Sequence, residues 1–462
     1  MQVKSTTLFG ERKVIFKETE RSVTPFGGLW LFFEHLKLIG FREEAERNMP
    51  FRLTSRNAIR PVETLTSFLT SVLAGARRFS HTAVVRSDDA LHAMMGVERF
   101  PSDDSFRNFF KRFGMGEVSR FFHPMWSWMI SRLPDIEYSL DMDSTVFERY
   151  GRQEGSKKGF NPRKPGRSSH HPLLAVLAER CTVLHGWLRS GNTGSSSNAV
   201  AFMKEALALA KNLKIRCLRA DSGFFYDELM SFLESRGLKY IIVAKMTSHV
   251  KNMVCWSIRE WKEVDEIYSV GEIRFKLPTW SKERRFIVVR ERIRESKEAV
   301  GKKLIDVPGY TFRVFVTNMD GDPVEIWRDY NMRADVENRI EELKNDLAAD
   351  SFCMKWFYST EAVFRSILML FNLLSEFQHA AGIPKYKEPA TLRTQVFLCG
   401  AILGRAGHDL VIHMSKSWGG IGTRIPMVDN MIRCFSPTSP KLVPTGQNHY
   451  GFLFGKTAAF TT

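Results

Sequence analysis

The chain has 462 residues, of which 44% are hydrophobic, so it can form two or three globular domains and is not a low-complexity or disordered chain. Its 67 basic and 51 acidic residues give a formal net charge of +16, which favours a polyanionic partner because each neutralised phosphate releases counterions. The six cysteines show neither a CxxC pair nor Cys/His zinc spacing, which argues against structural zinc and a disulfide framework. No uncharged apolar run of roughly 18 residues occurs, and no signal-peptide pattern opens the chain. We therefore expect a cytoplasmic protein with no membrane association.

Residues 1–135 are expected to form a mainly helical domain that binds DNA. Within it, the segment 87–114 places Ser-Asp-Asp, a helix-start signal, before each of two short amphipathic stretches. Two short helices with a tight connection are compatible with a helix-turn-helix DNA reader, in which Arg107, Lys111 and Arg112 contact phosphates. The alternative is a helix pair that only packs against the rest of the domain.

From residue 136 the pattern changes to β-branched and apolar runs separated by helical patterns. The expected strands lie at 137–147, 172–191 (two strands), 215–221 and 239–246, and the expected helices at 197–213 and 226–237. Three consecutive strands followed by alternating helices and strands predict an α/β fold with a mixed sheet.

We expect this α/β domain to be interrupted by a β-rich insertion. The predicted division is a catalytic domain at 136–247 and 317–384, an insertion at 248–316 and a less regular C-terminal region at 385–462. The strongly apolar segment 361–382 is predicted to be a buried helix. Trp280 and Trp327 are candidates for stacking on an unpaired base, although tryptophans at such positions are more often part of a core.

Aspartates occur at the ends of two predicted strands. Asp141 and Asp143 share one face of their strand, and Asp221 ends another strand directly before Ser222 and Gly223. Carboxylates at strand ends can converge over a sheet edge, where three oxygen donors would hold Mg²⁺ or Mn²⁺. The alternative is that they cap turns.

The segment YNMRADVENRIEELK reads as a helix with one polar stripe. At roughly 100° per residue, Tyr330, Arg333, Glu337 and Lys344 fall within an arc of about 60°. The predicted core-facing residues on the neighbouring arc are Met332, Val336, Ile340, Leu343 and Leu347. Glu337 is therefore best placed to face the sheet edge, and Glu341, about 40° away, is its local rival. A solvated helix with paired charges is the alternative.

These residues resemble a known family. YNMRADVENRIEELK matches the Tyr-x2-Arg-x3-Glu-x6-Lys signature of a branch of DDE transposases from bacterial insertion sequences, whose catalytic domain has the RNase H-like (retroviral integrase) fold. The phrases DMDSTVFERYGRQEG, GFNPRKPGRSSHHPLLA, LRSGNTGS, RADSGFF and NRIEELKNDLAADSFC resemble that branch in the same order. The resemblance covers the chain from Leu140 to Ala380 and implies an RNase H-like core.

The resemblance also implies roles for individual residues. Asp143, Asp221 and Glu337 would form the DDE triad, which in that family binds two Mg²⁺ or Mn²⁺ ions. The Ser/Thr pair that follows Asp143 selects it over Asp141 as the first member of the triad. The residues expected to contact DNA near the cleaved end are Tyr330, Arg333 and Lys344.

A basic segment follows the first aspartate motif. Residues 152–171 carry six Lys or Arg and one Glu, are rich in Gly and Pro, and suit a connector that follows a DNA backbone. The predicted DNA contacts in it are Lys157, Lys158, Arg163, Lys164 and Arg167, with His170 and His171 as further candidates. A solvated loop is the alternative.

The expected function is a DNA transposase that binds terminal inverted repeats, cleaves the element's ends and transfers them to target DNA by two-metal chemistry. A homodimer is expected, because two DNA ends must be held together. Its expected location is the bacterial cytoplasm, at the nucleoid when bound to DNA. The alternatives are an RNase H-like nuclease without strand transfer and a non-catalytic DNA-binding descendant.

Overall fold

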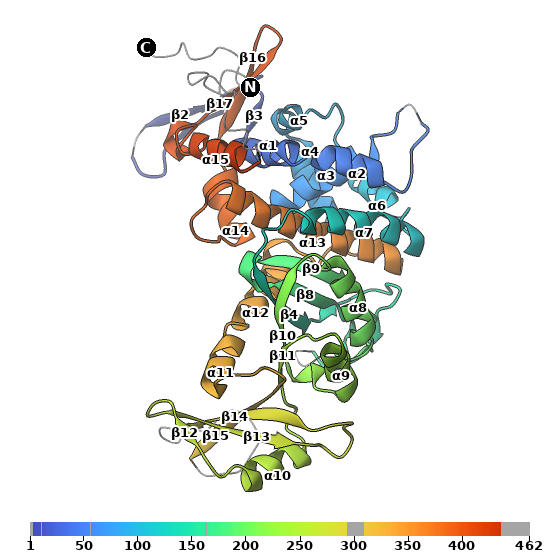
Figure 1. Ribbon diagram of the computed structural model, residues 1–462. Helices are drawn as coiled ribbons and strands as arrows, with labels where there is room; N and C mark the ends of the chain where they lie inside the picture. The colour runs from blue at the N-terminus through green and yellow to red at the C-terminus, as the bar shows by residue number, and fades with distance from the viewer. Residues whose placement is uncertain (1–2, 11, 56, 162–163, 293–308, 436–462) are drawn as a thin grey trace, which may run out of the picture.

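The computed structural model describes residues 3–10, 12–55, 57–161, 164–292 and 309–435. Helices from the N-terminal region gather at one end of the molecule, a large sheet occupies the middle, and α10 with the outer strands forms the other end (Figure 1). Within these ranges, no helix combines the length and the apolar content needed to cross a membrane.

A nine-stranded mixed sheet forms the framework of the molecule. Its order is β12 (Lys262–Glu263), β13 (Tyr268–Phe275), β14 (Arg284–Arg292), β15 (Tyr310–Thr317), β11 (Tyr240–Val243), β10 (Lys214–Ala220), β4 (Glu137–Ser144), β8 (Leu173–Leu177) and β9 (Thr182–Trp187). β10 runs parallel to β4 and β11, and the other neighbours pair antiparallel. The prediction of an α/β fold with a mixed sheet is confirmed.

Helices cover both faces of this sheet (Figure 1). α8 (Ala199–Leu209) and α9 (Asp227–Ser235) lie on one face, and α11 (Pro323–Asn331) and α12 (Ala334–Glu341) lie on the other. Every residue of β8 is buried, as expected for a strand covered on both sides. On β11, alternate residues join different apolar clusters, because successive side chains point to opposite faces.

The interval 248–316 continues the same sheet. It begins with the helix α10 (Ser248–Ser257), and its strands β13 and β14 reach the rest of the sheet through β15, where Thr317 pairs with Ile241 of β11. Residues 293–308 lie outside the described residues.

The N-terminal helices are α1 (Trp30–Leu38), α2 (Phe41–Asn48), α3 (Pro61–Leu73), α4 (Thr82–Arg86), α5 (Asp89–Met95), α6 (Asp103–Phe110) and α7 (Met115–Ile130). The long helix α13 (Phe357–Ala380) contacts α3, α6 and α7 on one side and β9 on the other. Almost all of its side chains are buried, which confirms the buried helix predicted at 361–382. One continuous apolar core therefore joins the helical region to the sheet.

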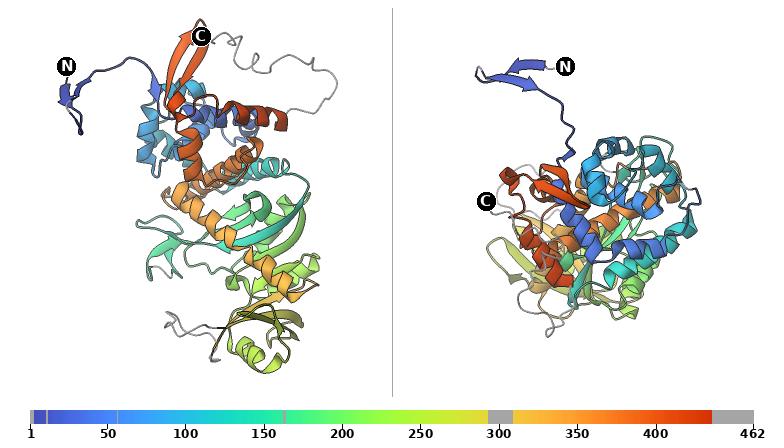
Figure 2. Two further views of the ribbon diagram at one scale, coloured as in Figure 1. Left: turned by 90° about the vertical axis from the view of Figure 1, so that its left-hand side faces the viewer. Right: turned by 90° about the horizontal axis from the view of Figure 1, so that it is seen from above.

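The two terminal regions meet in a small sheet. β3 (Val23–Thr24) pairs with β16 (Ala401–Ala406), which pairs with β17 (Asp409–Met414); α14 (Pro389–Leu392) and α15 (Ile425–Phe435) flank them in sequence. The hairpin β1 (Val3–Thr6) and β2 (Lys13–Phe16) extends away from the rest of the molecule (Figure 2).

A third sheet forms what we call the arm, residues 147–170 except 162–163. It contains β5 (Phe147–Glu148), β6 (Lys157–Lys158) and β7 (Ser168–His170), with β7 in the centre. The arm follows β4 directly and projects from the large sheet as the teal ribbon in the left view of Figure 2. It is therefore attached at the end of the strand that carries the first aspartate motif.

Candidate active site

The two aspartates of β4 have different partners. Asp141 is buried and accepts two hydrogen bonds from Arg219 of β10, at 2.6 Å from Nε and 2.8 Å from Nη2. Asp143, one residue from the strand end, instead lies 3.1 Å from Nη2 of Arg333. Asp141 is therefore taken up by a buried ion pair with Arg219. Of the two aspartates, Asp143 is the one that lies near the end of the strand.

Asp221 lies beside Asp143 because β4 and β10 are parallel neighbours. Ala220 pairs with Met142 in register, so the residues that follow them emerge at the same edge of the sheet. The Asp221 side chain accepts a hydrogen bond from the backbone N–H of Gly223 at 3.0 Å and caps the short 3₁₀ turn Ser222–Phe224. Asp221 thus caps a turn, as the alternative interpretation of the sequence expected. Only its Oδ1 accepts this hydrogen bond, and Oδ2 takes no part in it.

Glu337 reaches the same place from α12. Its side chain is 71% exposed, and its Oε1 lies 3.8 Å from Nη1 of Arg333. Burial raises the pKa of Asp143 to about 6; Arg333 opposes this shift, whereas the negative charges of Asp221 and Glu337 add to it. Glu341 is exposed. Two carboxylates of the expected triad, Asp221 and Glu337, therefore act electrostatically on the third, Asp143.

Arg333 is the positive charge at the centre of this group. Its side chain is buried, donates a hydrogen bond to the carbonyl oxygen of Met142 at 3.2 Å and lies against Asp143. The resemblance assigned this residue to DNA, but in this structure its guanidinium is directed at the carboxylates. In the described part of the chain, no three His, Cys, Asp or Glu side chains lie close enough together to hold a metal ion. The all-oxygen donor set nevertheless fits Mg²⁺ or Mn²⁺ in kind.

The signature segment is not one regular helix. α11 ends at Asn331, α12 begins at Ala334, and the backbone N–H of Arg333 bonds to the carbonyl of Tyr330, an i→i+3 contact that tightens the chain. Beyond α12, the residues Glu342–Asp346 form a π-helical turn. Of the predicted core face, Val336, Ile340, Leu343 and Leu347 are buried, but Met332 is 70% exposed because it lies at the break, so its placement was wrong.

Tyr330 and Lys344 lie on opposite sides of this break. Tyr330 is half-buried, and its ring packs on Phe315 of β15 at 4.8 Å. Burial raises the pKa of the Tyr330 phenol, and the charges of Arg333, Asp221 and Asp143 also act on it, so Tyr330 lies next to the carboxylates. Lys344 is in the π-helical turn and lines a cleft that Asp221 also lines.

This cleft has a volume of about 650 Å³ and lies between the arm, the end of β4 and the π-helical turn. Lys164 and Arg167 contact Tyr150, which lines the cleft, whereas Lys157 and Lys158 are not among its lining residues. Lys157 and Lys158 are exposed on β6, Lys164 lies 2.9 Å from Glu148, and the guanidinium of Arg167 lies 4.7 Å from the ring centre of Tyr150. Arg163 lies outside the described residues.

The two histidines of the arm are not surface contacts. His170 is fully buried; its Nδ1 accepts a hydrogen bond from Arg149, so its Nε2 donates to the carbonyl of Glu154. Burial lowers the pKa of His170 to about 4, and the Arg149 charge adds to this shift. His171 is also buried and donates to the carbonyl of Thr193. Both side chains hold neighbouring backbone segments together, and their role as DNA contacts stays a prediction.

The tryptophans proposed for base stacking are also packed inside the molecule. Trp280 is buried against Phe286, with ring centres 5.5 Å apart, and Trp327 packs on Tyr268 at 5.0 Å. Neither tryptophan is among the residues that line the cleft, and Trp327 is half-buried. Their stacking on an unpaired base stays a prediction.

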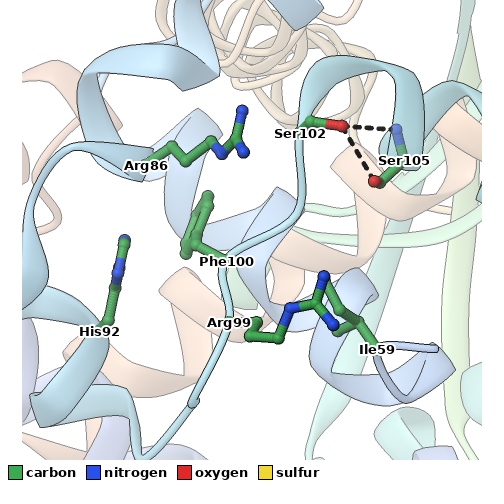
Figure 3. Close-up of a pocket in the computed structure, with 7 residues that line it drawn as sticks. All are labelled: Ile59, Arg86, His92, Arg99, Phe100, Ser102 and Ser105. Carbon is green, nitrogen blue, oxygen red and sulfur yellow. Dashed lines mark hydrogen bonds between the residues drawn. The ribbon is translucent and has the colours of Figure 1, made fainter. Parts of the chain in front are cut away.

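A second hollow lies in the N-terminal helical region (Figure 3). Its volume is about 330 Å³, and its lining includes Arg86, His92, Arg99, Phe100 and Ser102. Asp88 and Ser102 accept the first hydrogen bonds of α5 and α6, which agrees with the two Ser-Asp-Asp start signals. The expected phosphate contacts Arg107, Lys111 and Arg112 are all exposed.

Sequence reasoning missed the buried arginines that organise the site. Arg219 joins Asp141 to Asp329 at the end of α11, where it also donates to the Asp329 carbonyl at 2.8 Å. The available signal was a charged residue on a strand, in IRCLRAD, facing an aspartate on the neighbouring strand. Arg149, which directly follows β5, gave no comparable signal.

Three comparisons with known proteins bear on these observations. The family model described as "Transposase DDE domain group 1" matches residues 6–421. The search of curated proteins found no match. Among solved structures, a piggyBac transposase in a synaptic complex with hairpin DNA is similar at 12% sequence identity, with a TM-score of 0.45, over 93% of this chain and 91% of that chain.

Proposed function

Because the chain belongs to the family of transposases with a DDE domain of group 1, we propose that it binds the terminal inverted repeats of its own element, cleaves the element's ends and joins them to target DNA. We further propose that it is the transposase of a bacterial insertion sequence and acts in the cytoplasm. The proposal is supported by the positions of Asp143 and Glu337, which lie 3.1 Å and 3.8 Å from Arg333, and by the charge of Asp221, which acts on the same arginine.

In this proposal the three acids are the metal ligands. Two Mg²⁺ or Mn²⁺ ions, when bound, would activate the attacking oxygen and stabilise the leaving oxygen of a phosphodiester. Asp143 and Asp221 hold fixed positions because Asp143 lies one residue before the end of β4 and Asp221 directly follows β10. Glu337 is exposed on a short helix, so it is the ligand with the most freedom to adjust.

The remaining residues position DNA. Lys344 lies in the same cleft as Asp221, where an ammonium group can neutralise a phosphate next to the cleaved bond. Lys157, Lys158, Lys164 and Arg167 give the arm a basic surface, and Lys164 and Arg167 contact Tyr150, which lines that cleft. The helix pair α5 and α6, with its exposed basic residues, is proposed to read the inverted repeat.

A homodimer is the proposed working form, because two element ends have to be cut and joined in one assembly. The proposed partner is double-stranded DNA, both as inverted repeat and as target, in agreement with the net charge of +16.

The decisive experiment is incubation of the protein with DNA from the end of its own element and Mg²⁺, followed by mapping of both strands. We expect a cut at the element boundary and joined products when target DNA is added, and neither with Asp143→Asn or Asp221→Asn. Cleavage of the element's ends without joining to target DNA would show that the protein is a nuclease and not a transposase. Binding of the end DNA without any metal-dependent cleavage would indicate a DNA-binding protein whose acids only brace the fold.

A further inference from the structure

Two aromatic rings of the arm are exposed to solvent. Tyr150 is 72% exposed and Phe160 is 74% exposed, although large aromatic side chains are usually buried. They lie on either side of β6 in the sequence, and both line the cleft of about 650 Å³ that also contains Asp221 and Lys344. Both rings thus lie at a cleft that reaches Asp221, one of the candidate catalytic residues.

The arm that carries these rings is held firmly against the molecule. A Cβ atom at Gly159 would lie 1.8 Å from the carbonyl oxygen of Gly191, and one at Gly191 would lie 2.0 Å from the carbonyl oxygen of Ser169. Such a close approach of backbones leaves room only for glycine at both positions. The rings are therefore presented by a fixed support and not by a loosely attached loop.

The interior of the cleft carries buried polar groups with unused hydrogen-bonding capacity. Arg149 lines the cleft and is 3% exposed, and its Nη2 has no hydrogen-bond partner within the described residues, while its other nitrogens bond to His170, Glu148 and Asp350. Oε1 of Gln153, which also lines the cleft, has no partner there either. A buried guanidinium with an unpaired N–H normally indicates a missing acceptor.

Cations accompany the rings. The guanidinium of Arg167 lies 4.7 Å from the ring centre of Tyr150, and Nζ of Lys164 lies 3.1 Å from the Tyr150 hydroxyl oxygen. Aromatic rings bordered by Lys and Arg form the usual combination for single-stranded nucleic acid, in which bases stack on the rings and phosphates face the cations.

We infer that this cleft is a subsite for an unpaired nucleotide of the DNA substrate, with its base stacked on Tyr150 or Phe160 and its phosphate beside Arg167 and Lys164. A base pair inside a duplex cannot stack on these rings, because both of its faces are covered by the neighbouring base pairs. The Arg149 guanidinium supplies a donor for an acceptor atom of the nucleotide. This inference rests on the proposed function, since it assigns the occupant of the cleft that contains Asp221.

The test compares two DNA probes, a blunt duplex and the same duplex with a single-stranded overhang carrying 2-aminopurine. Binding is measured in EDTA, so that no cleavage can occur. We expect the wild-type protein to quench the overhang fluorescence. The double variant Tyr150→Ala and Phe160→Ala should bind the overhang probe about tenfold more weakly or worse, with unchanged affinity for the blunt duplex. Tyr150→Phe should bind as the wild type does, because the ring is kept.

Trp418→Ala is the matched control, since Trp418 is 52% exposed and lies outside the cleft. If the double variant lost the same affinity for both probes, the rings would contribute to DNA binding in general and not to an unpaired base. If its affinity for the overhang probe were unchanged, the rings would not contact the DNA. Either result overturns the inference. The proposed function fails separately, through absence of Mg²⁺-dependent cleavage, which this binding assay does not measure.

Discussion

The guanidinium of Arg333 lies 3.1 Å from the carboxylate of Asp143 in the interior of the candidate site. A positive side chain thus holds the carboxylate that a divalent ion would have to bind, and the two compete. We predict that Arg333→Gln increases the affinity for Mn²⁺ by about tenfold, because removal of a nearby cation strengthens cation binding. The increase in melting temperature on addition of Mn²⁺ measures this affinity in the wild type and in the variant.

Arg328→Gln is the control for this comparison, since Arg328 is exposed on α11. An equal Mn²⁺ effect in wild type and Arg333→Gln would show that the ion does not bind at Asp143.

The second prediction separates the two glutamates of α12. Glu337→Gln should lower Mg²⁺-dependent cleavage at least about a hundredfold, because a metal ligand is lost, while DNA binding remains. Glu341→Gln changes the same chemical group on the same helix, and we expect it to retain activity because it is Glu337 that lies next to Arg333 in the candidate site. Strand cleavage and gel-shift assays measure the two effects. The reverse pattern would assign the metal to Glu341.

The third prediction concerns the buried ion pair between Arg219 and Asp141. Arg219→Met leaves the buried Asp141 carboxylate without its partner and should lower the free energy of unfolding by about 3–5 kcal/mol. Lys214→Ala on the same strand breaks the exposed pair with Asp135 and should cost no more than about 1 kcal/mol. Urea denaturation of the two variants compares them. Similar losses would mean that the buried pair contributes nothing special to stability.

The fourth prediction is a pH dependence from Glu342. This buried side chain hydrogen-bonds to the Tyr386 hydroxyl and lies 3.0 Å from Arg339, yet burial raises its pKa from 4.5 to about 7. The folded state therefore holds a proton that the unfolded state releases, so its contribution to stability is complete below pH 4.5 and is lost as the pH rises to about 7. Glu342→Gln should remove this fall, on the order of 1–3 kcal/mol.

Thermal unfolding between pH 4.5 and 8 measures this effect. Glu341→Gln, at the exposed neighbouring position, should leave the pH profile as in the wild type. If the stability of Glu342→Gln still fell with pH as in the wild type, the proton responsible would be bound by another group.

The fifth prediction concerns the basic surface of the arm. If Lys157 and Lys158 neutralise phosphates, replacing each by Ala should reduce the slope of log affinity against log salt by about 1. Lys211→Ala, beyond the end of α8 on the other side of the sheet, should leave the slope unchanged. Fluorescence anisotropy with end DNA over a range of salt concentrations gives the slopes. If all three variants showed the same salt dependence as the wild type, Lys157 and Lys158 of the arm would not contact DNA phosphates.

The sequence predicted the mixed sheet because alternating and apolar strand patterns are local signals, and β4, β8, β9, β10 and β11 all lie where those patterns do. The sequence also predicted that Asp143 and Asp221 lie close together. This follows because β4 and β10 are parallel neighbours, whose ends lie at the same edge of the sheet. The details that depend on tertiary contacts were not predictable. A helical wheel assumes uniform geometry, so it placed Met332 in the core, whereas the chain tightens at Arg333 to reach Met142.

The same limit applies to single aromatic and basic residues. Trp280 and Tyr150 look equally available in the sequence, and only the packing around Phe286 buries the first while the arm exposes the second. Likewise, nothing local shows that Arg333 faces acids and not phosphates.

The position of α13 has a consequence for how the protein is made. The helices α1 to α7 leave the ribosome first, but α13 (Phe357–Ala380), which packs against α3, α6 and α7, is synthesised only after the nine-stranded sheet. Until then the faces of α3, α6 and α7 that contact α13 lack this partner, so a nascent chain stopped before α13 should depend on chaperones. Fusion proteins built from the N-terminal helices alone would inherit the same exposed surface and should aggregate unless α13 is supplied with them.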